Sequence, residues 1–169
     1  ELGYLDPATE RIVSHLPETF SPADIDHACQ EARDADIDGA DLDIAVSRVH
    51  WVASSNYVVE FDPAKPISEH LISPSAPMES QGIEDARFVR FVDDDGTVTY
   101  YGTYTAFDGT RILPQLIETE DFHRFRISTL TGPAAYHKGI AIFPRRMNGD
   151  LVALSRHDHV NCYVMRSDD

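Results

Sequence analysis

Residues 82–106 read GIEDARFVRFVDDDGTVTYYGTYTA and predict a β-hairpin. Two runs rich in aromatic and β-branched residues, a composition typical of strands, flank the turn sequence Asp94-Asp95-Gly96. An Asp-Gly pair between such runs is among the strongest short-range signals for a tight turn between antiparallel strands. The pattern therefore places residues 86–92 and 97–107 on neighbouring strands of one sheet.

A carboxylate pair, Glu84-Asp85, stands at the start of the first strand of this hairpin, and Arg87 follows two positions later. The apolar residues from Phe88 to Val92 predict a strand that enters a core. An acid beside an arginine at a strand start commonly caps a turn or forms a surface ion pair, which contributes little to stability. The other interpretation is that the pair marks the reacting end of a functional site, and the residues alone leave both open.

The last third of the chain repeats this pattern. Residues 140–146 (IAIFPRR) lead to Asn148-Gly149 and then to residues 150–158 (DLVALSRHD), which predicts a second hairpin. A further strand is expected after each hairpin, at residues 111–119 and 161–169. The two turn glycines lie 53 positions apart, and meanders repeated at about 40–50 residues are typical of β-propeller blades. Two blades cannot close a ring, and the sequence lacks an initiator Met, so we expect a part of a longer protein.

The first third predicts helices. Ser21-Pro22-Ala23-Asp24 supplies an N-cap, a proline at the first helical position and an acid in the first turn. Ile25, Ala28, Cys29 and Ala32 then recur at helical spacing, and a second helix is expected from about Asp41 to Ala53. Residues 1–54 are therefore predicted to be a helical N-terminal segment. Residues 55–169 are predicted to be a β domain whose first strand covers Asn56–Asp62, where apolar residues alternate.

An acidic stretch between the two helices resembles a calcium-binding loop. Asp34, Asp36, Asp38 and Gly39 match positions one, three, five and six of an EF-hand loop. The twelfth position, which needs a bidentate Glu, is Ala45. We therefore predict a solvated turn here and no metal site.

Composition and charge limit the function. With 169 residues, 42% of them hydrophobic and 25% charged, the chain has the composition of an ordinary globular protein. Its net charge of −15 argues against nucleic acid as a partner, because phosphates would be repelled. Residues 121–166 nevertheless carry 7 bases and 3 acids, a balance of +4 that suits either a small anion or scattered solvated arginines.

The location is expected to be cytoplasmic. No run of apolar residues is long enough to span a membrane, and the first residues show no signal-peptide pattern. The two cysteines, Cys29 and Cys162, lie far apart and form no Cys-x-x-Cys pair. That usage fits a reduced compartment, while a single long-range disulfide stays open.

Three segments in the expected order resemble glycoside hydrolase family 130, which contains β-mannoside phosphorylases and related hydrolases. They are GIEDARFV (residues 82–89), YYGTYTA (residues 100–106) and KGIAIFPRRMNGDLVALSR (residues 138–156). The likeness covers about residues 54–169, and it departs from the family at Ala86, where many relatives have proline. The resemblance implies a mostly β fold that forms part of a five-bladed β-propeller, about two blades, preceded by a helical segment.

The resemblance also implies a set of site residues. The family's catalytic acid falls on Asp85, and its two phosphate-binding positions fall on Lys138 and Arg156. Three further residues are candidates for contact with the sugar. Arg87 is expected either to hold the carboxylate or to contact the sugar, Tyr104 either to pack within its strand or to stack on the sugar ring, and Asn56 to line the channel. No metal is expected at His157 and His159. No cofactor is expected either, with inorganic phosphate acting as co-substrate.

The implied activity is glycosidase-like: an inverting phosphorylase that converts a mannosyl oligosaccharide and phosphate to mannose 1-phosphate. A hydrolase needs a second carboxylate to activate water. Phosphate is already an anionic nucleophile and needs a basic pocket instead. Lys138, Arg156 and the surplus of +4 in residues 121–166 therefore favour phosphorolysis. A β-mannoside hydrolase on the same scaffold and a non-catalytic carbohydrate-binding propeller fragment remain alternatives. The expected partners are an oligosaccharide and phosphate, with no nucleic acid and no membrane, and assembly into homo-oligomers is left open. Residues 1–169 alone are expected to be inactive.

Overall fold

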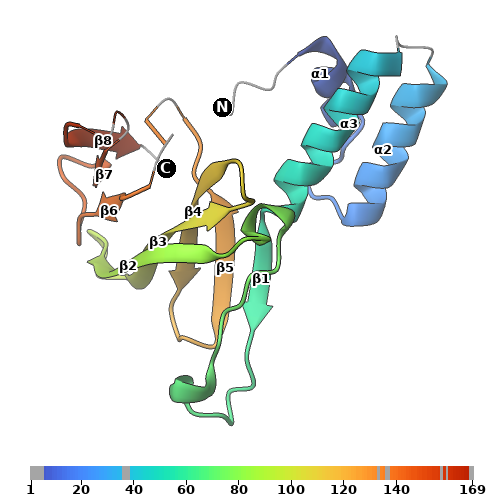
Figure 1. Cartoon of the computed structure of the whole chain (residues 1–169). Coiled ribbons are helices and arrows are strands. Elements are labelled where there is room, and N and C mark those ends of the chain that lie inside the picture. The colour runs from blue at the N-terminus through green and yellow to red at the C-terminus, as the bar shows by residue number, and fades with distance from the viewer. Residues whose placement is uncertain are drawn as a thin grey trace. The chain divides into compact units, whose positions relative to one another are not determined.

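The computed structural model of the chain describes residues 6–35, 39–132, 134–135, 138–156, 158 and 160–167. The chain divides into two compact units, Glu1–Ser54 and Ser55–Asp169. Among the described residues, the α-helices lie in the first unit and the strands in the second (Figure 1). Every strand pairing is antiparallel, which confirms the predicted class of a mostly β protein preceded by helices. The propeller arrangement stays a prediction.

The first unit contains three helices, α1 (Pro7–Ser14), α2 (Pro22–Asp34) and α3 (Gly39–Ser54). The predicted cap of α2 is confirmed, because Ser21 Oγ accepts from the Asp24 N–H while Asp24 accepts from the Ser21 N–H at 2.7 Å. All four positions predicted on the inner side of α2 are buried. The core consists of Ala8, Ile12, Ile25, Ala28, Cys29, Ala32, Leu42, Ala45 and Val46. None of the helices in the described ranges is long and apolar enough to cross a bilayer.

The larger sheet of the second unit has the strand order β1-β5-β4-β3-β2. Its strands are β1 (Tyr57–Glu60), β2 (Ile83–Val92), β3 (Val98–Phe107), β4 (Ile112–Thr119) and β5 (Arg124–Thr129). Strands β2 to β5 are consecutive neighbours in an up-and-down meander, which is also the arrangement within a propeller blade. Strand β1 pairs with β5, so the first strand in the sequence lies at the edge opposite β2 (Figure 1).

Both predicted hairpin turns are confirmed. In the first, the Asp93 N–H donates to the Thr97 carbonyl at 2.9 Å, and Gly96 has a φ of 88°. In the second, Asn148 and Gly149 have φ values of 57° and 89°, the two consecutive left-handed residues that a type I′ turn requires. This turn joins two strands of a three-stranded sheet of order β6-β7-β8. These strands are β6 (Ala141–Ile142), β7 (Leu151–Ser155) and β8 (Tyr163–Ser167).

Strand β2 does not enter the core as its apolar run predicts. Phe91 is buried, but Phe88 is 52% exposed, because β2 is the last strand of its sheet and has a neighbour on one side only. The Phe88 ring lies over Gly102 of β3, where an added Cβ would come within 2.6 Å of Phe88 Cε1. A glycine in β3 thus lets an edge aromatic lie flat against the sheet.

Candidate functional site

The predicted acid lies on a β-bulge at the edge of the larger sheet. Glu84 pairs with Thr105 and Arg87 with Thr103, so two residues of β2, Asp85 and Ala86, face a single position of β3. Asp85 has a φ of 59°, in the left-handed region that Asp and Asn tolerate better than other side chains with a Cβ. A bulge bends the strand and redirects the extra side chain. The local geometry therefore sets Asp85 apart from the regular alternation of β2.

The segment that contains Lys138 is joined to this bulge. Lys138 Nζ lies 3.0 Å from Glu84 Oε1. The carbonyl of Ile140, two residues after Lys138, accepts a hydrogen bond from Thr103 Oγ1 of β3 at 2.6 Å. The hydrogen bond from Lys138 to Glu84 raises the pKa of Lys138 above its usual range, and the charge of Asp85 adds to this shift. Asp85, Lys138 and Gly139 also line one hollow, too small to admit a water molecule, together with residues of β3 and β4.

Gly139 brings two arginines to the same place. It has a φ of 88°, and an added Cβ would lie 3.3 Å from Arg87 Nη1 and 4.0 Å from Arg156 Cδ. Arg87 belongs to β2, while Arg156 directly follows β7 in the other sheet. Arg87 and Arg156 therefore lie beside Gly139, the residue that follows Lys138 in the sequence.

Most other bases of the basic third are neutralised by acids. The ion pairs are Arg124–Glu60, Arg126–Glu118, Arg146–Asp93 and Arg166–Asp150. The surplus of +4 counted from the sequence thus does not produce one broad basic surface, since each of these pairs cancels a charge.

Tyr104 lines the same hollow, and its hydroxyl is held by Glu79. It is 4% exposed, and its hydroxyl donates to Glu79 Oε1 at 2.5 Å. Glu79, at the end of the 3-10 turn η2 (Pro77–Glu79), is fully buried and also accepts from the Tyr57 hydroxyl and from the N–H groups of Ser75 and Ala76. Because its hydroxyl is hydrogen-bonded to Glu79, Tyr104 contributes to the hollow as a fixed part of β3.

The buried tyrosines predict a loss of stability at alkaline pH. Burial, together with Glu79, raises the pKa of Tyr57 to about 12 and also raises that of Tyr104. An unfolded tyrosine titrates near pH 10, so the neutral hydroxyl of Tyr57 stabilises the fold fully below about pH 10 and ceases to do so as the pH rises to about 12. Urea denaturation at intervals from pH 8 to pH 12 measures this loss. The unfolding free energy should fall less steeply with pH in Tyr57→Phe than in the wild type. An equal fall in both proteins would show that Tyr57 does not cause the loss.

The structure does not bring Asn56 to the group around Asp85. Asn56 Oδ1 accepts from the Thr129 N–H at 3.0 Å and so joins the start of β1 to β5. Thr129 pairs with Gln115, and Gln115 pairs with Tyr104, opposite the bulge. Asn56 is thus four strand spacings from β2, about 19 Å, which is too far to contact the same small group as Asp85.

Four of the residues considered for metal binding, His157, His159, Asp36 and Asp38, lie outside the described residues. Within the described part of the chain, no group of three or more His, Cys, Asp or Glu side chains is placed to hold a metal ion. Cys29 is a buried free thiol and Cys162 an exposed one.

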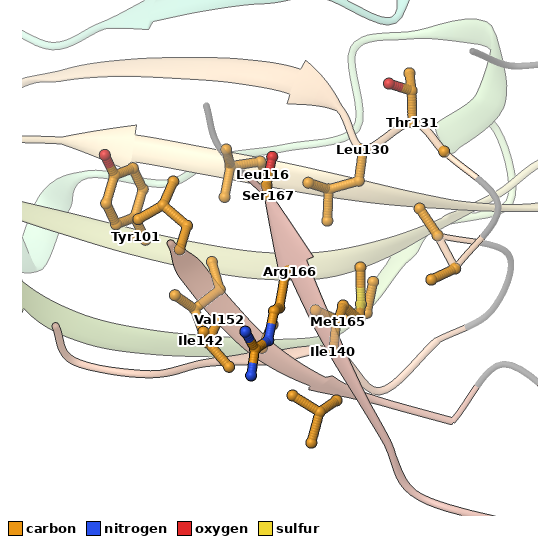
Figure 2. Close-up of a pocket in the computed structure, with 16 residues that line it drawn as sticks. Tyr101, Leu116, Leu130, Thr131, Ile140, Ile142, Val152, Met165, Arg166 and Ser167 are labelled. Carbon is orange, nitrogen blue, oxygen red and sulfur yellow. The ribbon is translucent and has the colours of Figure 1, made fainter. Parts of the chain in front are cut away.

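A larger apolar cavity of about 410 Å³ lies between the two sheets of the second unit (Figure 2). Side chains such as Leu116, Val152 and Met165 line it, and Arg166 supplies the one charged group among the described lining residues. None of its described lining residues carries a carboxylate, the acid that glycosyl transfer requires. Ile140 lines both this cavity and the hollow beside Asp85, so the two adjoin.

Two important residues, Glu79 and Gly139, were not among the site residues predicted from the sequence. Glu79 reads locally as an acid in a proline-rich loop, and its burial depends on Tyr57 and Tyr104, which are distant in sequence. Gly139 stands beside Lys138 in the segment KGIAIF, and a glycine next to a candidate anion ligand is a signal for close approach.

No family model matches the chain, and no curated protein sequence matches it either. A similar solved structure is that of the β-1,2-mannobiose phosphorylase from Listeria innocua in complex with β-1,2-mannobiose, at 25% identity and a TM-score of 0.47. The similarity covers 63% of this chain and 29% of that one, so the chain spans less than a third of that protein's length. A TM-score below 0.5 does not establish a shared fold or a shared activity.

Proposed function

We propose that this chain supplies one side of the active site of a glycoside phosphorylase that transfers a mannosyl group from a β-mannoside to inorganic phosphate. The observation that carries the proposal is that Arg87 and Arg156 lie beside Gly139, next to Lys138, and that Lys138 and Gly139 border the same hollow as Asp85. The resemblance of residues 82–89, 100–106 and 138–156 to family 130 supports the substrate class.

The proposed reaction exchanges one bond to the anomeric carbon for another. Asp85 donates its carboxyl proton to the oxygen of the departing sugar as the glycosidic C–O bond breaks. A phosphate oxygen forms the new C–O bond from the opposite face, which gives mannose 1-phosphate with inversion. Arg156 and Arg87 offer planar pairs of donors and Lys138 a point charge, a combination suited to a small dianion.

Three cations beside one acid favour phosphate over water as the nucleophile. An inverting hydrolase needs a carboxylate base about 6.5–9.5 Å from the acid. The acid adjacent to Asp85 in the sequence, Glu84, forms an ion pair with Lys138. Phosphate needs no base, because it is already charged, and it needs the cations that this site offers.

The test compares product release from a β-mannoside oligosaccharide with and without inorganic phosphate, using the protein that contains this chain. A phosphorylase forms mannose 1-phosphate only with phosphate, a hydrolase forms mannose in both conditions, and a binding module forms neither. Arg156→Ala should raise the KM for phosphate about tenfold or more, since it removes charge-assisted hydrogen bonds of roughly 1.5–3 kcal/mol. Arg145→Ala removes an exposed arginine from the same unit and serves as the control.

Two glycines with the same backbone conformation allow a matched test of the hollow. Gly139 and Gly149 have φ values of 88° and 89°, but a Cβ at Gly149 would meet nothing within 4 Å. Both Ala variants should lose about 1–2 kcal/mol of unfolding free energy from the left-handed strain. Only Gly139→Ala should also raise the KM for phosphate, because its Cβ presses on Arg87. Equal KM values in the two variants would separate Gly139 from the phosphate site.

A further inference from the structure

We propose that Glu84 is an internal competitor that occupies Lys138 until phosphate displaces it. The inference rests on the proposed role of Lys138 in binding phosphate and adds a residue that sets the affinity of that site. Its basis is the ion pair between Glu84 Oε1 and Lys138 Nζ, 3.0 Å apart, in which Lys138 also borders the hollow lined by Asp85 and Gly139.

The position of Glu84 fits this role because of the bulge. Glu84 keeps its regular pairing with Thr105 on β3, whereas Asp85, the next residue, is displaced from the alternation. The bulge thereby separates the two neighbouring carboxylates along β2. One of them, Glu84, is bound to the ammonium group of Lys138, which leaves Asp85 without that ion pair.

The pair can also be broken at little cost. The side chains of Glu84 and Lys138 are 54% and 47% exposed, and ion pairs between such exposed groups contribute little to stability. Phosphate brings two negative charges and several acceptor oxygens, so it can replace one carboxylate oxygen at Lys138. Once phosphate is bound, the charge of Glu84 repels it, and the carboxylate has to turn toward solvent.

The expected result is tighter binding of phosphate when the competitor is removed. Glu84→Gln keeps the size of the side chain but not its charge, and should tighten inorganic phosphate binding about threefold to tenfold at pH 7. Glu84→Asp keeps the charge but shortens the side chain, so it should give a smaller gain through weaker contact with Lys138. The control is Glu60→Gln, which breaks the exposed Glu60–Arg124 pair at the opposite edge of the same sheet. It should change the affinity less than twofold, since it alters net charge alone.

A double-mutant cycle separates this inference from the proposed function. Phosphate is titrated at fixed ionic strength into the wild type, Glu84→Gln, Lys138→Gln and the double variant, with amide chemical shifts of residues 84–87 and 138–140 as the readout. Lys138→Gln should weaken binding, and the gain from Glu84→Gln should be smaller in its presence. If Lys138→Gln weakens phosphate binding but Glu84→Gln binds phosphate no more tightly than the wild type, the role of Glu84 as a competitor is rejected and the phosphate site at Lys138 stands. If phosphate binds to none of the four proteins, both are overturned.

Discussion

Asp85→Asn is expected to lower turnover of a β-mannoside by about 10²–10⁴ while leaving the fold intact, because an amide cannot donate the proton that the leaving sugar needs. Asparagine tolerates a positive φ as well as aspartate does, so the bulge at φ 59° should persist. The measurement is kcat for mannose 1-phosphate formation, alongside the thermal unfolding midpoint of the same preparation.

Two comparisons make this test specific for an acid. The defect of Asp85→Asn should shrink on an aryl mannoside with a good leaving group, because such a group departs with little protonation. Asp85→Ala should be as inactive as Asp85→Asn but less stable, by about 1–2 kcal/mol, since alanine lacks the tolerance for this conformation. Near-normal turnover of Asp85→Asn on the natural oligosaccharide would remove Asp85 from the mechanism.

The features that were predictable from the sequence are those that neighbouring residues determine. The cap of α2 needs only Ser21 and Asp24, and each hairpin needs only its turn residues and the alternating strands beside them. In β1 the predicted alternation is also present, with Tyr57 and Val59 more buried than Val58 and Glu60. Such patterns act within a few residues, so their chemistry does not depend on the rest of the fold.

The features that escaped prediction depend on which strands become neighbours. Strand β1 pairs with β5, an element that the sequence pattern did not reveal, and this pairing places Asn56 far from Asp85. Phe88 is exposed because β2 has no second neighbour, although its own sequence reads as a core strand. The approach of Arg87 and Arg156 likewise depends on Gly139, a residue of a third segment, and no spacing along the chain encodes it.

Glu79→Ala is expected to cause the largest loss of stability, about 3–5 kcal/mol, because it leaves several buried donors without an acceptor. Glu79 is fully buried and accepts from the Tyr104 hydroxyl at 2.5 Å, from the Ser75 N–H at 2.7 Å and from the Ala76 N–H at 3.0 Å. The Tyr57 hydroxyl lies 2.9 Å and 3.0 Å from its two oxygens. All these groups donate, which is the environment that an acceptor-only carboxylate satisfies.

Variants at two 3-10 turns of the same loop isolate this network. Glu69 is the last residue of η1 (Ile67–Glu69), as Glu79 is of η2, but it is exposed, so Glu69→Ala should change the unfolding free energy by less than about 0.5 kcal/mol. Glu79→Gln keeps one acceptor oxygen but turns an NH₂ group toward donors. Its loss of unfolding free energy should lie between those of Glu69→Ala and Glu79→Ala, at about 1–3 kcal/mol. Urea denaturation of the three variants at pH 7 gives these values. If Glu79→Ala were no less stable than Glu69→Ala, the hydrogen bonds of Glu79 would not hold Tyr104 and β3 in place, and the wall of the hollow beside Asp85 would need another support.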